Sequence, residues 1–401
     1  MSTPPETSPE RSFYYELSDQ QLRRRGSAKW ATFDADVLPA FVAEMDFRTA
    51  PAVQDALASA VERELYGYTA ARSSDGAAAA LADWLRARAG WQVSPKRVHV
   101  LPDVLKGMEL ALAALSPAAT PVIVPTPSYP PFFEVVRASG RELVEVPTLV
   151  SDGRHELDLE SIDRALAAGA RTVILCNPHN PLGRAFARDE LAALAEVVEG
   201  HGGRVIADEV HAPLTYSDAV WTPYATVSEA AAAHSAGLMS CSKGWNIPGL
   251  KCAQIVLNTE ADEEAWSRLS RLLTHGASVI GILANEAAYR RGDAWLRDTV
   301  AYLEGNRALL LELLERHLPG VVSTRPEGTY LAWLDCRRLG LDSPQEFFLE
   351  KARVALNDGA GFGDVGRGCV RLNFATSRSR LEEIVERMGR AVSAASAPAR
   401  A

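Results

Sequence analysis

Short apolar runs alternate with longer amphipathic segments through the centre of the chain. Strand-like apolar runs occur at residues 99–101, 122–124, 172–176, 204–207 and 253–257. Ala- and Leu-rich stretches with helical spacing lie between them, for example at 189–199. This alternation, from about residue 50 to 285, predicts an α/β fold with a mainly parallel sheet that binds ligands at its strand ends.

A second region follows this alternating part. Apolar residues at helical spacing between 294 and 317 predict a long helix, and strand-like and helical patterns alternate again after about residue 318. The 401 residues, 47% of them hydrophobic, are enough for two cores. We therefore expect a large domain at 50–285, a long inter-domain helix at 286–317 and a smaller domain that contains 318–401.

Composition and charge exclude several function classes. A net charge of −9 argues against nucleic-acid or anionic-membrane partners. No Gly-x-Gly-x-x-Gly turn follows a strand-like run, which argues against a nicotinamide enzyme. The absence of a long apolar run and of an apolar signal core predicts a cytoplasmic protein without membrane spans. Five scattered cysteines predict reduced thiols and no metal site.

Lys243 and Asp208 carry the most specific chemistry. Lys243 lies in the irregular segment SCSKGWN (240–246), and Asp208 ends the strand-like run at 204–207. Pyridoxal phosphate needs an amine that binds its aldehyde and an acid that keeps its ring nitrogen protonated. The two residues together predict a pyridoxal-phosphate site. Taken singly, each has a simpler explanation, because most lysines are solvated and an Asp after a strand often caps a helix.

Further candidates fall on either side of this pair. Asn180, in the turn NPHNPLG (177–183), is placed to bind a ring hydroxyl or a substrate carboxylate, although the segment also fits an ordinary turn. Arg371 lies inside a strand-like run, where a substrate α-carboxylate or a structural ion pair would satisfy it. A phosphate could accept hydrogen bonds from the hydroxyl and ammonium groups of Ser240, Ser242 and Lys251.

The order Asn180, Asp208, Lys243, Arg371 resembles that of fold-type I pyridoxal-phosphate enzymes of the class I/II aminotransferase superfamily. More closely, the chain resembles the MalY/PatB family of cystathionine and cysteine-S-conjugate β-lyases over nearly its whole length. The resemblance rests on FVAEMDF (41–47), YGYT (66–69), PSYPPF (127–132), DEVH (208–211), YLAWLD (330–335), ALNDG (355–359) and RLNF (371–374). It implies an aspartate aminotransferase-like fold in which residues 1–49 join the small domain, and a homodimer with shared active sites.

The resemblance also implies residue roles. Tyr129 would stack on the cofactor ring, and His211 would bind the ring oxygen. Tyr68 would reach the phosphate of the partner subunit's cofactor. The backbone of Ala43 would close over the substrate carboxylate. The amides of the segment that includes Val104 and Leu105 would hold the phosphate.

Three features depart from the family pattern. Asp103 stands in the phosphate-binding turn, where a carboxylate repels a phosphate, so we expect its side chain to cap the following helix instead. Ala212-Pro213 and Trp221 replace residues that are usually different in the family, which leaves the substrate open. The aromatic residues Trp221, Tyr224 and Trp245 either line an apolar substrate pocket or pack in the core.

The expected activity is β-elimination on an amino-acid substrate. Cystathionine or a cysteine S-conjugate would give a thiol, pyruvate and ammonia, with Lys243 as the base that removes the Cα proton. Transamination of a small amino acid uses the same lysine and is the main alternative. A specialised carbon–sulfur lyase of secondary metabolism and a cofactor-binding regulator without turnover are further alternatives.

Overall fold

A seven-stranded sheet is the largest element of the computed structural model, which describes residues 15–68, 74–151 and 153–396. The strand order is β2-β10-β9-β8-β7-β3-β4, and only β10 runs antiparallel to its neighbours. The strands are β2 (Val98–Leu101), β3 (Val122–Thr126), β4 (Leu143–Pro147), β7 (Thr172–Cys176), β8 (Arg204–Asp208), β9 (Ser235–Met239) and β10 (Ala253–Leu257). The predicted mainly parallel sheet and its five predicted strands are confirmed.

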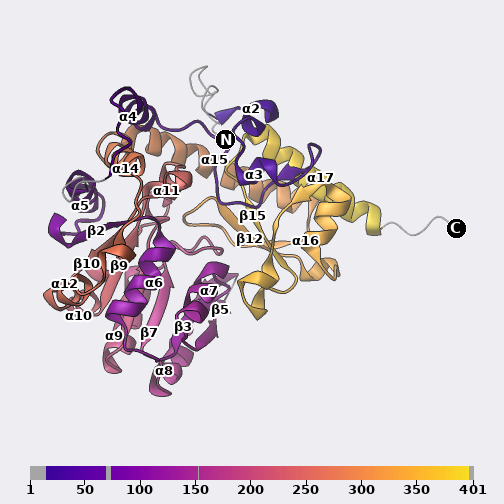
Figure 1. The fold of residues 1–401 in the computed structure, drawn as a ribbon. Helices are drawn as coiled ribbons and strands as arrows, with labels where there is room; N and C mark the ends of the chain where they lie inside the picture. Colours follow the sequence, from indigo (N-terminus) through magenta and orange to yellow (C-terminus); the bar gives the residue numbers. More distant parts are fainter. Residues whose placement is uncertain (1–14, 69–73, 152, 397–401) are drawn as a thin grey trace.

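Helices cover both faces of this sheet, which is why its central strands are apolar throughout. One face packs against α6 (Val104–Leu115), α7 (Pro130–Ala138) and α12 (Glu260–Ser267). The other face packs against α8 (Leu159–Ala167), α9 (Arg188–Gly200) and α10 (Glu229–Ala233). Figure 1 shows these helices around the sheet.

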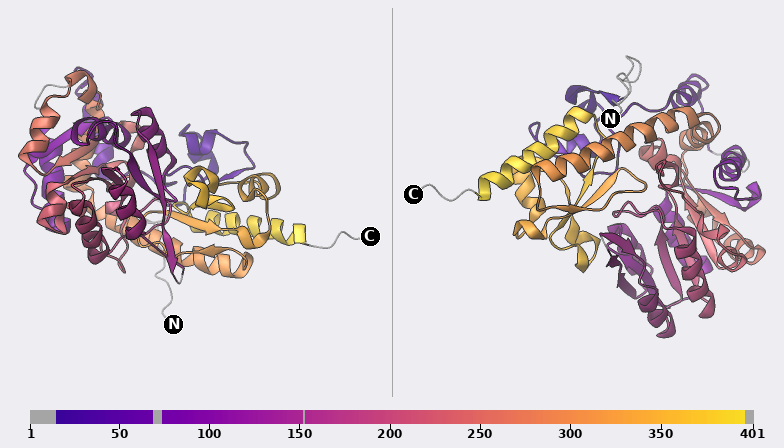
Figure 2. Two further views of the ribbon diagram at one scale, coloured as in Figure 1. Left: turned by 90° about the horizontal axis from the view of Figure 1, so that it is seen from below. Right: turned by 180° about the vertical axis from the view of Figure 1, so that it is seen from behind.

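A second, antiparallel sheet lies beside the first and has the order β11-β12-β15-β14. Its strands are β11 (Val322–Ser323), β12 (Leu331–Asp335), β15 (Cys369–Asn373) and β14 (Asn357–Asp358). The long helices α15 (Asp293–His317) and α17 (Arg378–Ser396) run side by side behind it, as the right-hand view of Figure 2 shows. Two short elements, α16 (Pro344–Phe347) and the π-helical turn at Phe348–Ala352, complete this part.

The sequence predicted that the long helix begins at residue 286, but in the structure it begins later. Residues 286–291 are the last turns of α14 (Val279–Arg291), and α15 starts at Asp293. Gly292 separates the two helices because its N–H closes α14 on the Ala288 carbonyl. A side chain at Gly292 would also collide with Trp245, whose Nε1 would lie 2.3 Å from the added Cβ.

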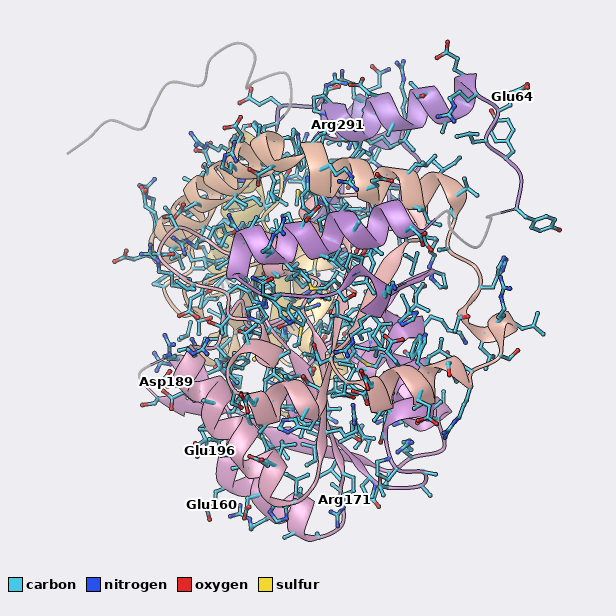
Figure 3. All side chains as sticks on the ribbon, turned by 90° about the vertical axis from the view of Figure 1, so that its left-hand side faces the viewer. Glu64, Glu160, Arg171, Asp189, Glu196 and Arg291 are labelled. Atoms are coloured by element: carbon cyan, nitrogen blue, oxygen red, sulfur yellow. The ribbon has the colours of Figure 1, made fainter. Side chains whose placement is uncertain are left out.

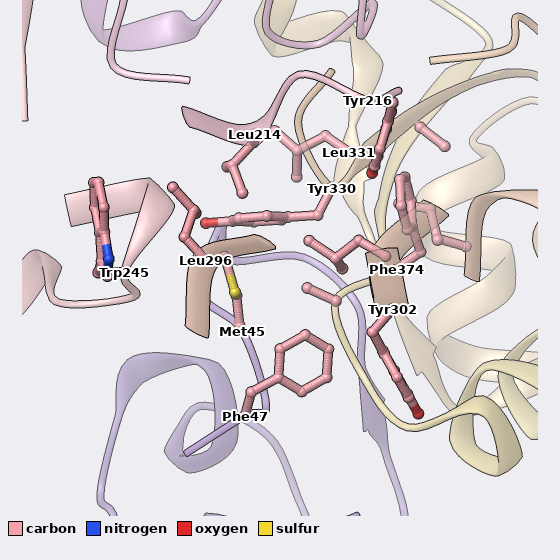
Figure 4. Packing of buried hydrophobic residues seen from close by; sticks show 14 of the residues in the cluster. Met45, Phe47, Leu214, Tyr216, Trp245, Leu296, Tyr302, Tyr330, Leu331 and Phe374 are labelled. Carbon is pink, nitrogen blue, oxygen red and sulfur yellow. The ribbon is translucent and has the colours of Figure 1, made fainter. Parts of the chain in front are cut away.

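The amino-terminal segment lies against the second sheet. β1 (Leu38–Pro39) pairs in parallel with β13 (Val354–Ala355), and Asp46 N–H donates to the Ala375 carbonyl. Met45 and Phe47 pack beside Tyr302, Tyr330 and Leu331 in one apolar cluster, which Figure 4 shows from close by. The amino-terminal segment thus packs with the carboxy-terminal part of the chain. The division into domains at the stated boundaries stays a prediction.

The remaining helices are shorter or lie next to the elements described above. They are α2 (Asp19–Arg23), α3 (Ala28–Ala31), α4 (Pro51–Glu62), α5 (Asp75–Ala89), α11 (Cys241–Gly244) and α13 (Arg271–Thr274), and a small hairpin is formed by β5 (Leu149–Ser151) and β6 (Arg154–Glu156). Among the described residues, no helix is both long and apolar enough to cross a membrane.

Candidate active site

Most of the predicted site residues gather at one edge of the seven-stranded sheet. The parallel strands β3, β7, β8 and β9 all end at this edge, and each is followed by a residue that the sequence singled out. These residues are Tyr129, Asn180, Asp208 and Ser240 with Lys243. β15 of the second sheet brings Arg371 to the same place, where its guanidinium contacts Asn180.

Lys243 lies in the single-turn helix α11, which Ser240 caps by accepting from the Ser242 N–H. Its Nζ donates to the Ala43 carbonyl at 3.0 Å. Burial, and then the positive charge of Arg371, lower the pKa of Lys243 to about 8, although Glu44 and Asp208 act in the opposite direction. The uncharged, nucleophilic form of the amine is therefore far more populated near neutral pH than in an ordinary lysine.

Asp208 occupies the last position of β8, deep in the molecule. One carboxylate oxygen accepts from the Val210 N–H at 3.1 Å. Burial raises the pKa of Asp208 to about 6, while the Val210 N–H and the nearby Lys243 lower it. A cation placed against this carboxylate would stabilise its charged form, and the protonated ring nitrogen of pyridoxal phosphate is such a cation.

Arg371 is a buried guanidinium held only by neutral groups. It donates to Asn180 Oδ1 at 2.9 Å, to the Phe41 carbonyl at 3.0 Å and to Asn357 Oδ1 at 2.7 Å, and it lies over the Phe362 ring. No carboxylate among the described residues pairs with it, and its Nε has no hydrogen-bond partner. A buried positive charge without a counter-ion is costly, so the site is complementary to an anion.

His211 and Tyr129 complete the walls around these charges. His211 is buried and its Nδ1 has no partner. Burial, Lys243 and Arg371 hold the pKa of His211 well below its usual value, so the ring is neutral. Tyr129 directly precedes α7. Burial raises its pKa, and the nearby charges of Arg371 and Asp208 also act on it.

The phosphate end of the predicted site is built from α6, α11 and Lys251. Val104 and Leu105 are the first residues of α6, whose leading amides have no acceptor within the helix. Ser242 is partly exposed, but the Ser240 hydroxyl is buried and donates to the Cys252 carbonyl. Lys251 ion-pairs with Asp103 at 2.9 Å. Asp103 also caps α6 by accepting from the Lys106 N–H, so the predicted cap is confirmed.

Segment 41–46 lies across Lys243 and is fastened by residues to which the sequence assigned no role. Tyr330 donates to the Ala43 carbonyl, and Asn373 donates to the carbonyls of Val42 and Glu44. Asn246 exchanges two hydrogen bonds of 2.8 Å with the backbone of Met45. One signal was available for Asn373, because the two-residue period of a strand puts it on the same face as Arg371.

Two sets of predicted residues lie away from this cluster. Tyr68 is 98% exposed and does not reach the site within its own chain, and Thr69 lies outside the described residues. The aromatic residues Trp221, Tyr224 and Trp245 are buried: Trp245 donates to the Gly292 carbonyl, and the Tyr224 hydroxyl bonds to His234. They pack in the core, and they do not form an open apolar pocket.

Pyridoxal phosphate fits this arrangement. Lys243 would hold its aldehyde, Asp208 its ring nitrogen and Tyr129 the face of its ring. The free Nδ1 of the neutral His211 would meet its ring oxygen. Lys251, Ser242 and the first amides of α6 would hold its phosphate, and Arg371 would remain for the carboxylate of an amino acid.

The comparisons with known proteins agree with this chemistry. Residues 42–388 match the family described as aminotransferase class I and II. The chain is 39% identical to a cystathionine β-lyase of Corynebacterium glutamicum, over 92% of this chain and 97% of the relative. It is 34% identical to the cystathionine β-lyase PatB of Bacillus subtilis, over 89% of this chain and 93% of the relative.

A solved structure shows the same fold. A chain from Corynebacterium diphtheriae, assigned as a pyridoxal-phosphate-dependent β-cystathionase, superposes with a TM-score of 0.90 and 44% sequence identity. The match covers 95% of this chain and 99% of the other. The expected fold class is therefore confirmed.

Proposed function

Because the chain belongs to the class I and II aminotransferase family, and within it to the MalY/PatB branch, we propose that it is a pyridoxal-phosphate-dependent carbon–sulfur β-lyase. Its substrates are cystathionine or cysteine S-conjugates, and its products are a thiol, pyruvate and ammonia. The relatives named cystathionine β-lyase support the choice of reaction.

The observation that carries an amino-acid substrate is the unpaired guanidinium of Arg371. Its neutral partners leave a positive charge that is close enough to Lys243 to lower the pKa of that residue. Lys243 itself lacks a carboxylate partner among the described residues. An α-carboxylate bound by Arg371 and Asn180 would neutralise that charge and point the amino acid's Cα toward Lys243. This geometry suits an α-amino acid better than a simple amine or a keto acid without an amino group.

The protein's own groups then have defined tasks. When bound, pyridoxal phosphate links the substrate amine and accepts the electron pair left at Cα. Lys243, once free, removes the Cα proton as an uncharged amine, which its lowered pKa favours. Asp208 keeps the ring nitrogen protonated. The Cβ–S bond breaks with its electron pair going to sulfur, and water completes the conversion to pyruvate and ammonia.

We also propose that the enzyme is a homodimer with shared active sites. Several large side chains are exposed at the end of α4, in the segment that follows it and in α13: Val61, Tyr66, Tyr68, Leu272 and Leu273. Figure 3 looks onto the face that carries Glu64, which follows the end of α4 and precedes Tyr68 by four residues. Exposed apolar side chains of this size are what an interface between two subunits would cover. Beyond the second subunit, we expect only the small-molecule substrate as a partner. The five cysteines are free and buried, which favours a cytoplasmic location.

The test is thiol release from pure protein. Cystathionine, and cysteine S-conjugates with alkyl and aryl groups, are incubated with the protein and pyridoxal phosphate, and the freed thiol is titrated with a chromogenic disulfide. We expect repeated turnover that Lys243→Ala abolishes. The control variant Lys96→Ala, at an exposed lysine outside the site, should leave it unchanged. An equal rate in the Lys243→Ala variant would contradict the proposal.

A further inference from the structure

Asp103 uses its two carboxylate oxygens for two different tasks at the phosphate end of the site. Oδ1 accepts from the Lys106 N–H at 2.9 Å and caps α6. Oδ2 accepts from Lys251 Nζ at 2.9 Å. The first contact is a helix cap that Asn or Ser would also make, whereas the second contact needs the negative charge.

The backbone conformation of Lys251 places its side chain beside Asp103. Lys251 follows the 3-10 turn Pro248–Leu250 in a left-handed conformation with φ of 52°, and β10 begins two residues later. Its position across from the start of α6 is therefore fixed by the chain. The side chains remain accessible, with 59% of Lys251 and 38% of Asp103 exposed. Accessible ion pairs are weak, so this one can exchange partners.

A phosphate at the start of α6 would meet both residues. Burial raises the pKa of Asp103, but hydrogen bonds from the Lys106 N–H and from Lys251 keep it below its usual value. The carboxylate is therefore charged at neutral pH. An incoming phosphate dianion is repelled by this carboxylate and competes with it for the same ammonium group.

We propose that Asp103 is an internal counter-ion that competes with the cofactor phosphate for Lys251 and so sets how tightly the protein holds pyridoxal phosphate. In the cofactor-free protein Asp103 neutralises Lys251. When the phosphate arrives, Lys251 is transferred from the carboxylate to the phosphate, and part of the binding free energy is lost in that exchange. The inference rests on the cofactor part of the proposed function and is independent of the reaction catalysed.

The experiment measures cofactor affinity, without turnover. Apoprotein is titrated with pyridoxal phosphate, and separately with pyridoxal, while visible absorbance and protein fluorescence are followed. Asp103→Asn keeps the cap of α6 and removes the charge. We expect it to bind pyridoxal phosphate roughly 2- to 5-fold more tightly than the wild type, the size of one partly exposed charge pair. Binding of pyridoxal, which lacks the phosphate, should not change.

Asp158→Asn is the matched control. Asp158 caps α8 by accepting from the Ser161 N–H at 2.9 Å, the same contact that Asp103 makes, but outside the site. We expect this variant to bind both ligands as the wild type does. Asp103→Ser, which also keeps a capping oxygen, should repeat the tightening and serves if the asparagine variant does not fold.

Two results would overturn the inference. Unchanged or weaker binding of pyridoxal phosphate in both Asp103 variants would mean that the carboxylate orients Lys251 for the phosphate. Equal tightening of pyridoxal and pyridoxal phosphate would mean that the effect does not pass through the phosphate. Cofactor uptake without thiol release would contradict only the β-lyase reaction, because these affinities do not depend on turnover.

Discussion

Two cations, the half-buried Lys243 and the buried Arg371, define the site at the scale of single residues. Burial lowers the pKa of Arg371 to about 10. Burial and the charge of Arg371 together lower the pKa of Lys243 to about 8. Both positive charges are at least partly removed from water, and their hydrogen-bond partners are neutral groups. The free energy lost in this way is recovered when an anionic substrate binds, which links recognition to stability.

The lowered pKa of Lys243 predicts the pH dependence of cofactor attachment. The amine is nucleophilic only when it has lost its proton, so the rate of attachment should rise with pH around about 8 and not around the usual 10.5. Stopped-flow absorbance of apoprotein with pyridoxal phosphate checks this. Arg371→Met removes a charge that lowers the pKa, so its midpoint should move to higher pH. A wild-type midpoint near 10.5 would contradict the account.

Substitution of Arg371 should separate substrate binding from cofactor binding. Arg371→Lys keeps a charge but loses the planar fork that holds a carboxylate with two hydrogen bonds. We expect KM for the amino acid to rise roughly 10- to 100-fold, since a charged hydrogen bond contributes about 1.5–3 kcal/mol. The Kd of pyridoxal phosphate should change little.

The control for that variant is Arg367→Lys, at an exposed arginine shortly before β15. It should leave both constants unchanged. Equal losses of substrate and cofactor affinity in Arg371→Lys would refute the assignment of Arg371 to the substrate carboxylate.

At the scale of elements, the sequence was informative wherever a strand was apolar along its whole length. β7 and β8 are buried on both faces, and their apolar runs were visible. β9 (Ser235–Met239) went unpredicted because its first residues, Ser235, Ala236 and Gly237, are weak strand formers. It is a strand because β8 and β10 supply its hydrogen bonds from either side.

The same limit applies to the site. Asp208 and Lys243 could be found because each ends or follows a recognisable element. The bonds between Asn246 and Met45 join residues 201 positions apart, and nothing local in the chain encodes them. Asn246 adopts a left-handed backbone with φ of 57°, which asparagine tolerates better than most residues. Pairings of this kind become visible only in the folded chain.

Close packing of α14 on the segment before Lys251 gives a prediction at this scale. A Cβ on Gly281 would lie 2.1 Å from the Leu250 carbonyl oxygen and 3.0 Å from its carbon. These are backbone atoms, so Gly281→Ala must displace the segment that carries Lys251. We expect a loss of about 1–3 kcal/mol in the free energy of unfolding and weaker binding of pyridoxal phosphate.

Gly249→Ala is the matched control for this substitution, because a Cβ there has no atom within 4 Å. Denaturant unfolding and the cofactor titration should distinguish the two variants. If Gly281→Ala were as stable as the wild type, the close approach of α14 to Leu250 would be refuted.

At the scale of the whole molecule, ion pairs connect the parts of the chain that carry the two sheets. Glu327, near the second sheet, pairs with Arg184 and Arg154 of the first part. Asp218 pairs with Arg307 of α15 and with Arg325. The site lies between these parts, with Lys243 on one side and Arg371 on the other. The relative position of the two sheets therefore sets the distance between cofactor and substrate carboxylate.

The proposed dimer predicts a role for Tyr68 that one chain cannot show. We expect sedimentation at twice the 43.3 kDa of one chain. Tyr68→Phe should weaken the binding of pyridoxal phosphate roughly 10- to 100-fold through loss of one hydrogen bond to a charged group, without dissociating the dimer. Tyr66→Phe, in the same exposed segment, should have no such effect. A monomer with full cofactor affinity would contradict the shared site.

The central claim is that the bound amino acid loses its sulfur substituent and does not merely exchange its amino group. The most direct measurement follows pyruvate from cystathionine with pure enzyme and no keto acid, over many equivalents of enzyme. The account predicts continuous pyruvate release at a rate that an added keto acid does not increase. No pyruvate until a keto acid is supplied, with amino transfer to it, would identify an aminotransferase and contradict the account.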